Sequence, residues 1–92
     1  DLIICLSHLG YNYRNSDTKI SDLKLAAATK NIDLIIGGHT HTFLRKPTVV
    51  KNIEGKNMLV NQVGCYGINL GKIDFYFDAD KNKAANGTSI IV

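Results

Sequence analysis

This sequence has few cysteines and no extended apolar run, and both absences exclude classes of protein. The two cysteines, Cys5 and Cys65, do not form a Cys-x-x-Cys pair, so a zinc site built from thiolates is not expected. Two isolated cysteines also give no basis for predicting a disulfide. The apolar run at residues 2–6 is far too short to cross a membrane, and it lacks the basic start of a signal peptide.

Clustered positive charge is absent as well. Eleven Lys and Arg residues against eight Asp and Glu residues give a net charge of +3, but the lysines are scattered. Without an arginine cluster or a stripe of basic and aromatic residues, a dedicated nucleic-acid surface is not expected. A mild positive field suits a small anionic substrate. The composition, 45% hydrophobic and 21% charged, is typical of a globular protein, and 92 residues allow one small domain at most.

Two apolar segments with a helical segment between them predict a βαβ unit. Residues 2–6 and 32–36 have the continuous apolar character of strands buried on both faces of a parallel sheet. Between them, Ser21 is a candidate N-cap for a short helix that ends near Asn31. The acidic residues at the helix start, Asp17 and Asp22, are interpreted as cap, turn or surface residues.

After Pro47 the pattern becomes that of an antiparallel β-meander. Residues 48–53 and 58–63 flank a Glu-Gly-Lys-Asn turn and predict a hairpin. Residues 72–78 alternate between apolar and polar side chains, and residues 88–92 are expected to form a last strand. The fold class is therefore α/β, a βαβ unit followed by an antiparallel meander.

All three histidines of the chain follow predicted strands. His8 comes just after residues 2–6, whereas His39 and His41 come just after residues 32–36. Parallel strands end at the same edge of a sheet, about 4.8 Å from one another, so we expect the imidazoles to converge there. In an extended segment His39 and His41 would point to the same side. Gly37 and Gly38 would let the backbone turn sharply and approach an ion or a phosphate closely.

Imidazole nitrogen is a ligand for Zn, Mn, Fe and similar ions, and a bound metal makes water nucleophilic at neutral pH. One histidine in a loop is usually an ordinary polar residue. Three at one sheet edge favour a metal site. Two alternatives stay open: a non-catalytic module with a single three-histidine metal site, and an interaction module whose histidines are incidental.

Two motifs carry a resemblance to a known family. Residues 35–42, Ile-Ile-Gly-Gly-His-Thr-His-Thr, resemble the closing motif of the calcineurin-like metallophosphoesterase superfamily. Residues 3–11, Ile-Ile-Cys-Leu-Ser-His-Leu-Gly-Tyr, resemble its preceding histidine motif in the form seen in the 5′-nucleotidase and 2′,3′-cyclic phosphodiesterase branch. Residues 62–67 and 70–74 resemble the strands that follow in that family. The match covers residues 1–78.

The resemblance implies a four-layer αββα sandwich with a dinuclear centre of Zn, Mn, Fe or similar ions. His8 and His39 would bind one metal, with His39 also acting in catalysis, and His41 would bind the other. The backbone of Gly37 and Gly38 would line the metal loop. A metal-activated water would hydrolyse a phosphate ester, with nucleotides as the expected substrates.

Several motifs of that family do not occur in this sequence. They are Asp-x-His, Gly-Asp and Gly-Asn-His followed by an acidic residue, and they would supply the remaining ligands. We therefore expect residues 1–92 to be the C-terminal portion of a single metallophosphoesterase domain whose upstream half is absent. By itself this fragment is expected to be inactive and to self-associate through exposed strand edges. The resemblance further implies a periplasmic or extracellular location.

Overall fold

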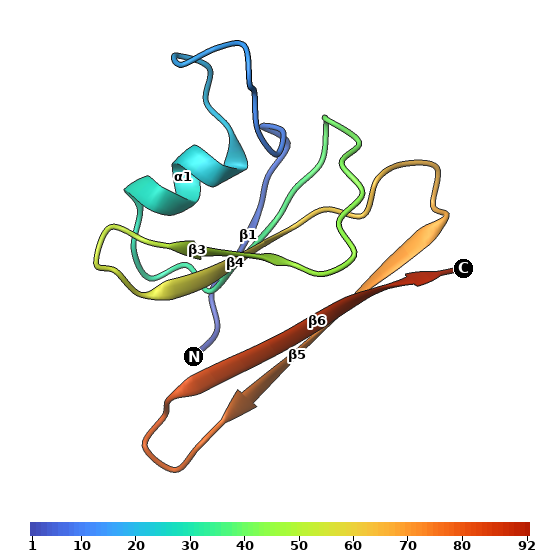
Figure 1. Cartoon of the computed structure of the whole chain (residues 1–92). Helices are drawn as coiled ribbons and strands as arrows, with labels where there is room; N and C mark the ends of the chain where they lie inside the picture. Colours follow the sequence, from blue (N-terminus) through green and yellow to red (C-terminus); the bar gives the residue numbers. More distant parts are fainter.

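The computed structural model describes all of residues 1–92. It contains one helix and six strands, in the order β1 (Ile4–Leu6), α1 (Asp22–Ala28), β2 (Leu34–Ile36), β3 (Thr48–Lys51), β4 (Asn57–Asn61), β5 (Asn69–Phe77) and β6 (Lys83–Ile91). The helix covers one face of a four-stranded sheet, and the long β5–β6 hairpin lies on the other side (Figure 1). No helix has the length and apolar character of a membrane span.

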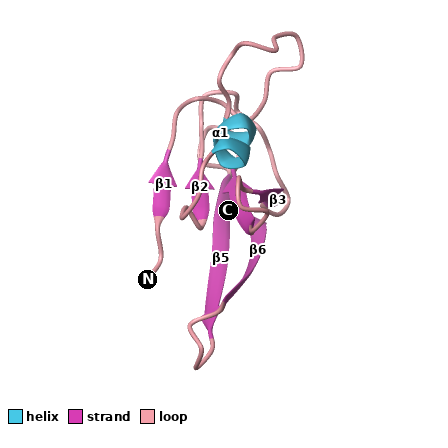
Figure 2. Ribbon diagram, turned by 90° about the vertical axis from the view of Figure 1, so that its left-hand side faces the viewer, coloured by secondary structure: helices cyan, strands magenta, loops and turns pink.

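The first sheet contains the predicted βαβ unit. Strands β1 and β2 run parallel, as their arrows show in Figure 2, with Cys5 opposite Ile35 in the register. Strand β4 pairs in parallel with β2 on its other side and in antiparallel with β3, which gives the strand order β1-β2-β4-β3. The predicted hairpin of β3 and β4 is therefore present, and through β4 it extends the parallel sheet.

The antiparallel second half of the chain is divided between two sheets. Strand β5 pairs with β6 over nine residue pairs, from Asn69 with Ile91 to Phe77 with Lys83, and forms a separate two-stranded sheet. Between β4 and β5 the backbone turns through positive φ at Gly64, Tyr66 and Gly67. Such angles break a strand, so the chain leaves the first sheet at this bend instead of continuing a single meander.

The expectation that both parallel strands are buried on two faces was wrong for β1. Leu6 is 79% exposed and Ile4 46% exposed, and Ile36 on the same face of β2 is 43% exposed, because this face, which points away from α1, is only partly covered. The strands are also shorter than predicted, with three residues each. Burial is concentrated beneath the helix, where Ile35 on β2 packs with other apolar side chains, namely Ala26, Met58 and Val60.

Helix α1 begins where the sequence predicts. The Ser21 hydroxyl accepts a hydrogen bond from the backbone N–H of Lys24, at 3.3 Å, as an N-cap residue does. The helix ends earlier than predicted, at Ala28, and Thr29 is extended. Asp22 lies in the first turn of the helix, as expected, but its side chain is completely buried.

Candidate histidine site

His8 and His39 lie side by side at the carboxyl ends of β1 and β2. Their rings meet in a T-shaped arrangement with centroids 5.1 Å apart and planes at 68°. The Ser7 N–H donates to the Ile36 carbonyl at 2.9 Å, so the parallel pairing continues to the residue before His8. A Cβ atom at Gly38 would stand 3.2 Å from His8 Nδ1, and a glycine there leaves the His8 ring its space. Both histidines are exposed to solvent.

His41 does not join this pair. Its nearest aromatic partner is Tyr66, with ring centroids 6.3 Å apart. The protein contains no group of three or more His, Cys, Asp or Glu side chains placed to hold a metal ion. As placed, the three histidines do not make the single three-histidine site of the first alternative. Only His8 and His39 lie side by side, so these two could supply at most two ligands of a metal site, and any others would come from other groups.

The loop that carries His39 and His41 has an uncommon backbone. Both residues have positive φ, 75° for His39 and 54° for His41, so the segment is not extended as the sequence analysis assumed. The Thr40 N–H donates to the Gly38 carbonyl at 3.0 Å, which closes a γ-turn centred on His39. Non-glycine residues adopt positive φ infrequently, and such conformations cluster at functional sites. This turn separates the directions of the two histidines.

Polar side chains anchor the same loop from two sides. The Thr40 hydroxyl accepts a hydrogen bond from the Tyr11 N–H at 2.9 Å and lies 2.8 Å from the Thr42 hydroxyl. From the end of β4, the buried Gln62 amide contacts both ends of the loop, at Gly38 and Thr42. The loop conformation is therefore fixed by residues distant in the sequence.

Asp22 connects the helix to both histidine loops. Its Oδ1 accepts a hydrogen bond from the Ser7 hydroxyl at 2.5 Å, next to His8. Its Oδ2 is buried without a hydrogen-bond partner, and it faces Gly37, where a Cβ atom would overlap it. A buried carboxyl oxygen without a hydrogen-bond partner is costly.

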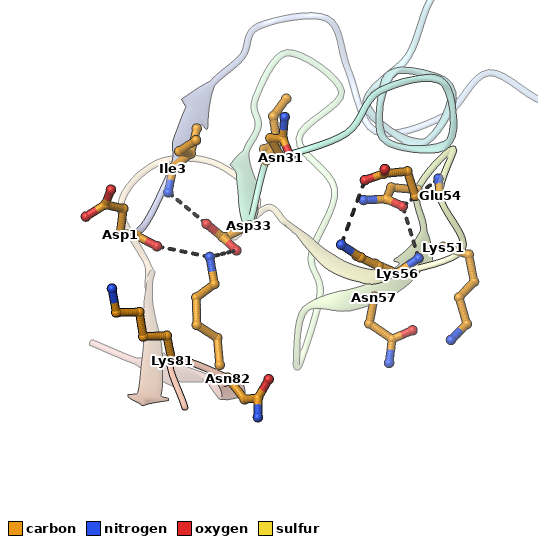
Figure 3. A pocket seen from close by; sticks show the side chains of 13 residues that line it. Asp1, Ile3, Asn31, Asp33, Lys51, Glu54, Lys56, Asn57, Lys81 and Asn82 are labelled. Carbon is orange, nitrogen blue, oxygen red and sulfur yellow. Dashed lines mark hydrogen bonds and ion pairs between the residues drawn. The ribbon is translucent and has the colours of Figure 1, made fainter. Parts of the chain in front are cut away.

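The largest cavity of the protein, about 710 Å³, lies at the opposite end of the first sheet (Figure 3). Charged residues line it, and none of the three histidines does. Across this space Lys83 forms an ion pair with Asp33 at 2.7 Å, and Asp33 also accepts a hydrogen bond from the Ile3 N–H. The ion pair ties the β5–β6 hairpin to the first sheet, and the bond to Ile3 links the segments that lead into β1 and β2.

Comparison with known proteins identifies the family. No family model matches the chain. The trifunctional nucleotide phosphoesterase protein YfkN of Bacillus subtilis (strain 168) is 47% identical over 76 residues, which cover 83% of this chain. The 5′-nucleotidase precursor of Thermus thermophilus has a crystal structure that superimposes with a TM-score of 0.69 and 37% identity over 76% of this chain. The chain belongs to the 5′-nucleotidase family.

The snake venom 5′-nucleotidase of Gloydius brevicauda is a more distant family member, 30% identical over 93 residues and 87% of this chain. The chain spans 4% of the length of YfkN, 14% of the snake protein and 16% of the Thermus chain. These similarities confirm the resemblance to the 5′-nucleotidase branch and the mixed α/β fold class. They concern only a small part of each relative.

Asp22 and Gln62 are the site residues that sequence reasoning missed in this family member. An Asp after an N-cap Ser is ordinary at a helix start, so its burial had no sequence signal of its own. Gln62 belongs to residues 62–67, which resemble a strand of the family, and this resemblance was the only sequence signal that could have pointed to it.

Proposed function

We propose that this chain forms the histidine-bearing part of a metal-dependent phosphoesterase that hydrolyses nucleotides with a metal-activated water at a dinuclear centre. The observation that carries the proposal is the juxtaposition of His8 and His39 at the carboxyl edge of parallel strands, with His39 at the centre of a γ-turn with positive φ. Open α/β sheets bind ligands at this edge. The names of the relatives, a nucleotide phosphoesterase and 5′-nucleotidases, support the reaction and the substrate class.

His8 and His39 would hold one divalent ion, Zn, Mn, Fe or similar, and His39 would also serve catalysis there. His41, on the same loop beside Tyr66, would ligate the second ion. When bound, such ions polarise a phosphoryl oxygen and lower the pKa of water. Gly37 and Gly38 keep the loop free of side chains, so phosphate oxygens can approach its backbone.

The proposal assigns residues 1–92 to the C-terminal portion of one catalytic domain, with the other ligands in the upstream portion. Two convergent ligands do not make a complete centre, so the isolated chain would be inactive. The open edge of β1, with Leu6 79% exposed, would favour self-association. Export from the cell is a further part of the proposal, supported by the venom origin of the snake relative.

The test compares this chain with the longer protein that contains it. Metal content is measured by mass spectrometry, and phosphate release is measured with nucleoside monophosphates. We expect the longer protein to hold two metal ions and release phosphate, and His8→Ala and His39→Ala to abolish release. The matched control is Lys56→Ala, an exposed residue of the β3–β4 turn, which should leave both quantities unchanged. A longer protein without metal or activity would overturn the proposal, and bound metal without phosphate release would indicate a non-catalytic metal site.

A further inference from the structure

Gln62 lies directly after β4, and its side chain spans the loop that carries His39 and His41. The residue is 2% exposed. Its Nε2 donates a hydrogen bond to the Gly38 carbonyl at 3.1 Å, and its Oε1 accepts one from the Thr42 N–H at 2.6 Å. One amide group therefore contacts the residue before His39 and the residue after His41.

The loop between these two contacts needs external support. His39 and His41 both have positive φ, and such backbone conformations persist only where the surroundings determine them. The γ-turn at His39 is closed by a single bond from Thr40 to Gly38 within the loop. The Gln62 amide adds a bond at each end, so the loop cannot relax to an extended form without breaking both of them.

The chemistry of the contact is specific to an amide. One end must donate, because its partner is a carbonyl, and the other must accept, because its partner is an N–H. This requirement also fixes the orientation of the amide. A carboxylate at position 62 would place an acceptor against the Gly38 carbonyl. An apolar side chain would leave the Thr42 N–H unsatisfied and the Gly38 carbonyl with its bond from Thr40 alone.

We infer that Gln62 is a positioning residue for the histidine site: its amide holds the loop in the conformation that turns His39 toward His8. The inference rests on the proposed function insofar as the positioned histidines are metal ligands. The geometric part, which is the dependence of the loop conformation on Gln62, stands independently of metal binding.

The test uses two readouts besides activity, both on the longer protein that contains this chain. The first is hydrogen exchange of the Thr42 amide in the metal-free protein, because that N–H is protected by Gln62 Oε1. The second is zinc affinity measured by competition with a chromophoric chelator. We expect Gln62→Met to accelerate Thr42 exchange at least about tenfold and to weaken zinc binding by about 10–100-fold, the range for residues that orient metal ligands.

Asn52 offers a matched control. It is another buried amide, 8% exposed, and its Oδ1 accepts hydrogen bonds from the backbone N–H groups of Glu54 and Lys56 at a different turn. Asn52→Leu should lower the melting temperature without changing Thr42 exchange or zinc affinity. If Gln62→Met fails to fold, Gln62→Asn gives the same comparison, since its amide is one methylene too short to reach both partners.

Each outcome decides a separate point. Unchanged Thr42 exchange in the Gln62 variant would overturn the inference, as would an equal loss of zinc affinity in Asn52→Leu, which would indicate general destabilisation. If the wild-type protein binds no zinc while Thr42 exchange still responds to Gln62, the proposed function fails and the role of Gln62 in shaping the loop holds.

Discussion

The rings of His8 and His39 lie 5.1 Å apart, although the two residues follow different strands. The parallel pairing of β1 with β2 carries both loops to one edge of the sheet, and Ser7 extends that pairing beyond β1. The ring contact is thus a product of βαβ topology. Beneath the two loops lies the buried Asp22, whose carboxylate accepts a hydrogen bond from the Ser7 hydroxyl.

Two replacements of Asp22 test the hydrogen bond that it accepts from Ser7. Asp22→Ala removes the acceptor of the Ser7 hydroxyl and should lower the free energy of unfolding by about 2 kcal/mol. Asp22→Asn keeps an oxygen for the Ser7 hydroxyl, so it should cost less than Asp22→Ala. Urea unfolding measures both. The control Asp17→Ala, at an exposed position, should stay within about 0.5 kcal/mol, and equal losses for Asn and Ala would contradict the argument.

The position of the histidine pair was largely predictable, because it depends on local patterns. Apolar runs ending in Ser7-His8 and in Gly37-Gly38-His39 locate the ends of two strands, and the helix between them makes the strands parallel. The direction of His41 was not predictable. It depends on a positive φ in a loop that Gln62 anchors from a distant part of the chain.

Burial was the other property that local pattern could not give. The run at residues 2–6 has the composition of a central strand, yet within this chain β1 is an end strand, since β2 is its only neighbour. Asp22 is the opposite case: aspartate is common at helix starts and is usually exposed there, but here it is buried between α1 and the two loops.

A methyl group at Gly37 should clash with Asp22. The added Cβ atom would overlap the Asp22 carboxylate, so we expect Gly37→Ala to lower the free energy of unfolding by about 1–3 kcal/mol. Because the clash involves that one side chain, the double variant with Asp22→Ala should be more stable than the sum of the two single losses predicts. Denaturant unfolding of the wild type, the two single variants and the double variant gives the double-mutant cycle. Strict additivity would show that the two residues do not meet.

Asp78 should remain ionised to a lower pH than an ordinary aspartate. The N–H groups of Asn82, first from its backbone and then from its side chain, donate to the carboxylate and lower its pKa, with a smaller contribution from the backbone of Asp80. A lowered folded-state pKa adds stability above the unfolded pKa, and this contribution is lost as the pH falls through the folded value. Titration followed by the carboxyl ¹³C shift should give Asp78 a lower midpoint pH in the folded protein than in a peptide of residues 78–82. Asn82→Ala removes only the side-chain donor and should move the midpoint upward; an unmoved midpoint would exclude the side-chain contribution, since the backbone N–H remains.

The open edge of β1 should drive association of the isolated chain. Ile3 and Ser7 form backbone bonds to β2, and since these groups alternate along a strand, the N–H groups of Ile4 and Leu6 face the unpaired side. Light scattering should therefore give a mass above the 10.1 kDa of one chain. Leu6→Lys, at a side chain 79% exposed, should return the mass toward the monomer because a charge on an edge strand opposes pairing with a second copy.

Ile53→Lys is the control. It also replaces an exposed aliphatic side chain by lysine, at a 65% exposed position outside the strands, and should not change the mass. A monomeric wild-type chain, or an equal response to both substitutions, would show that the β1 edge is not the contact.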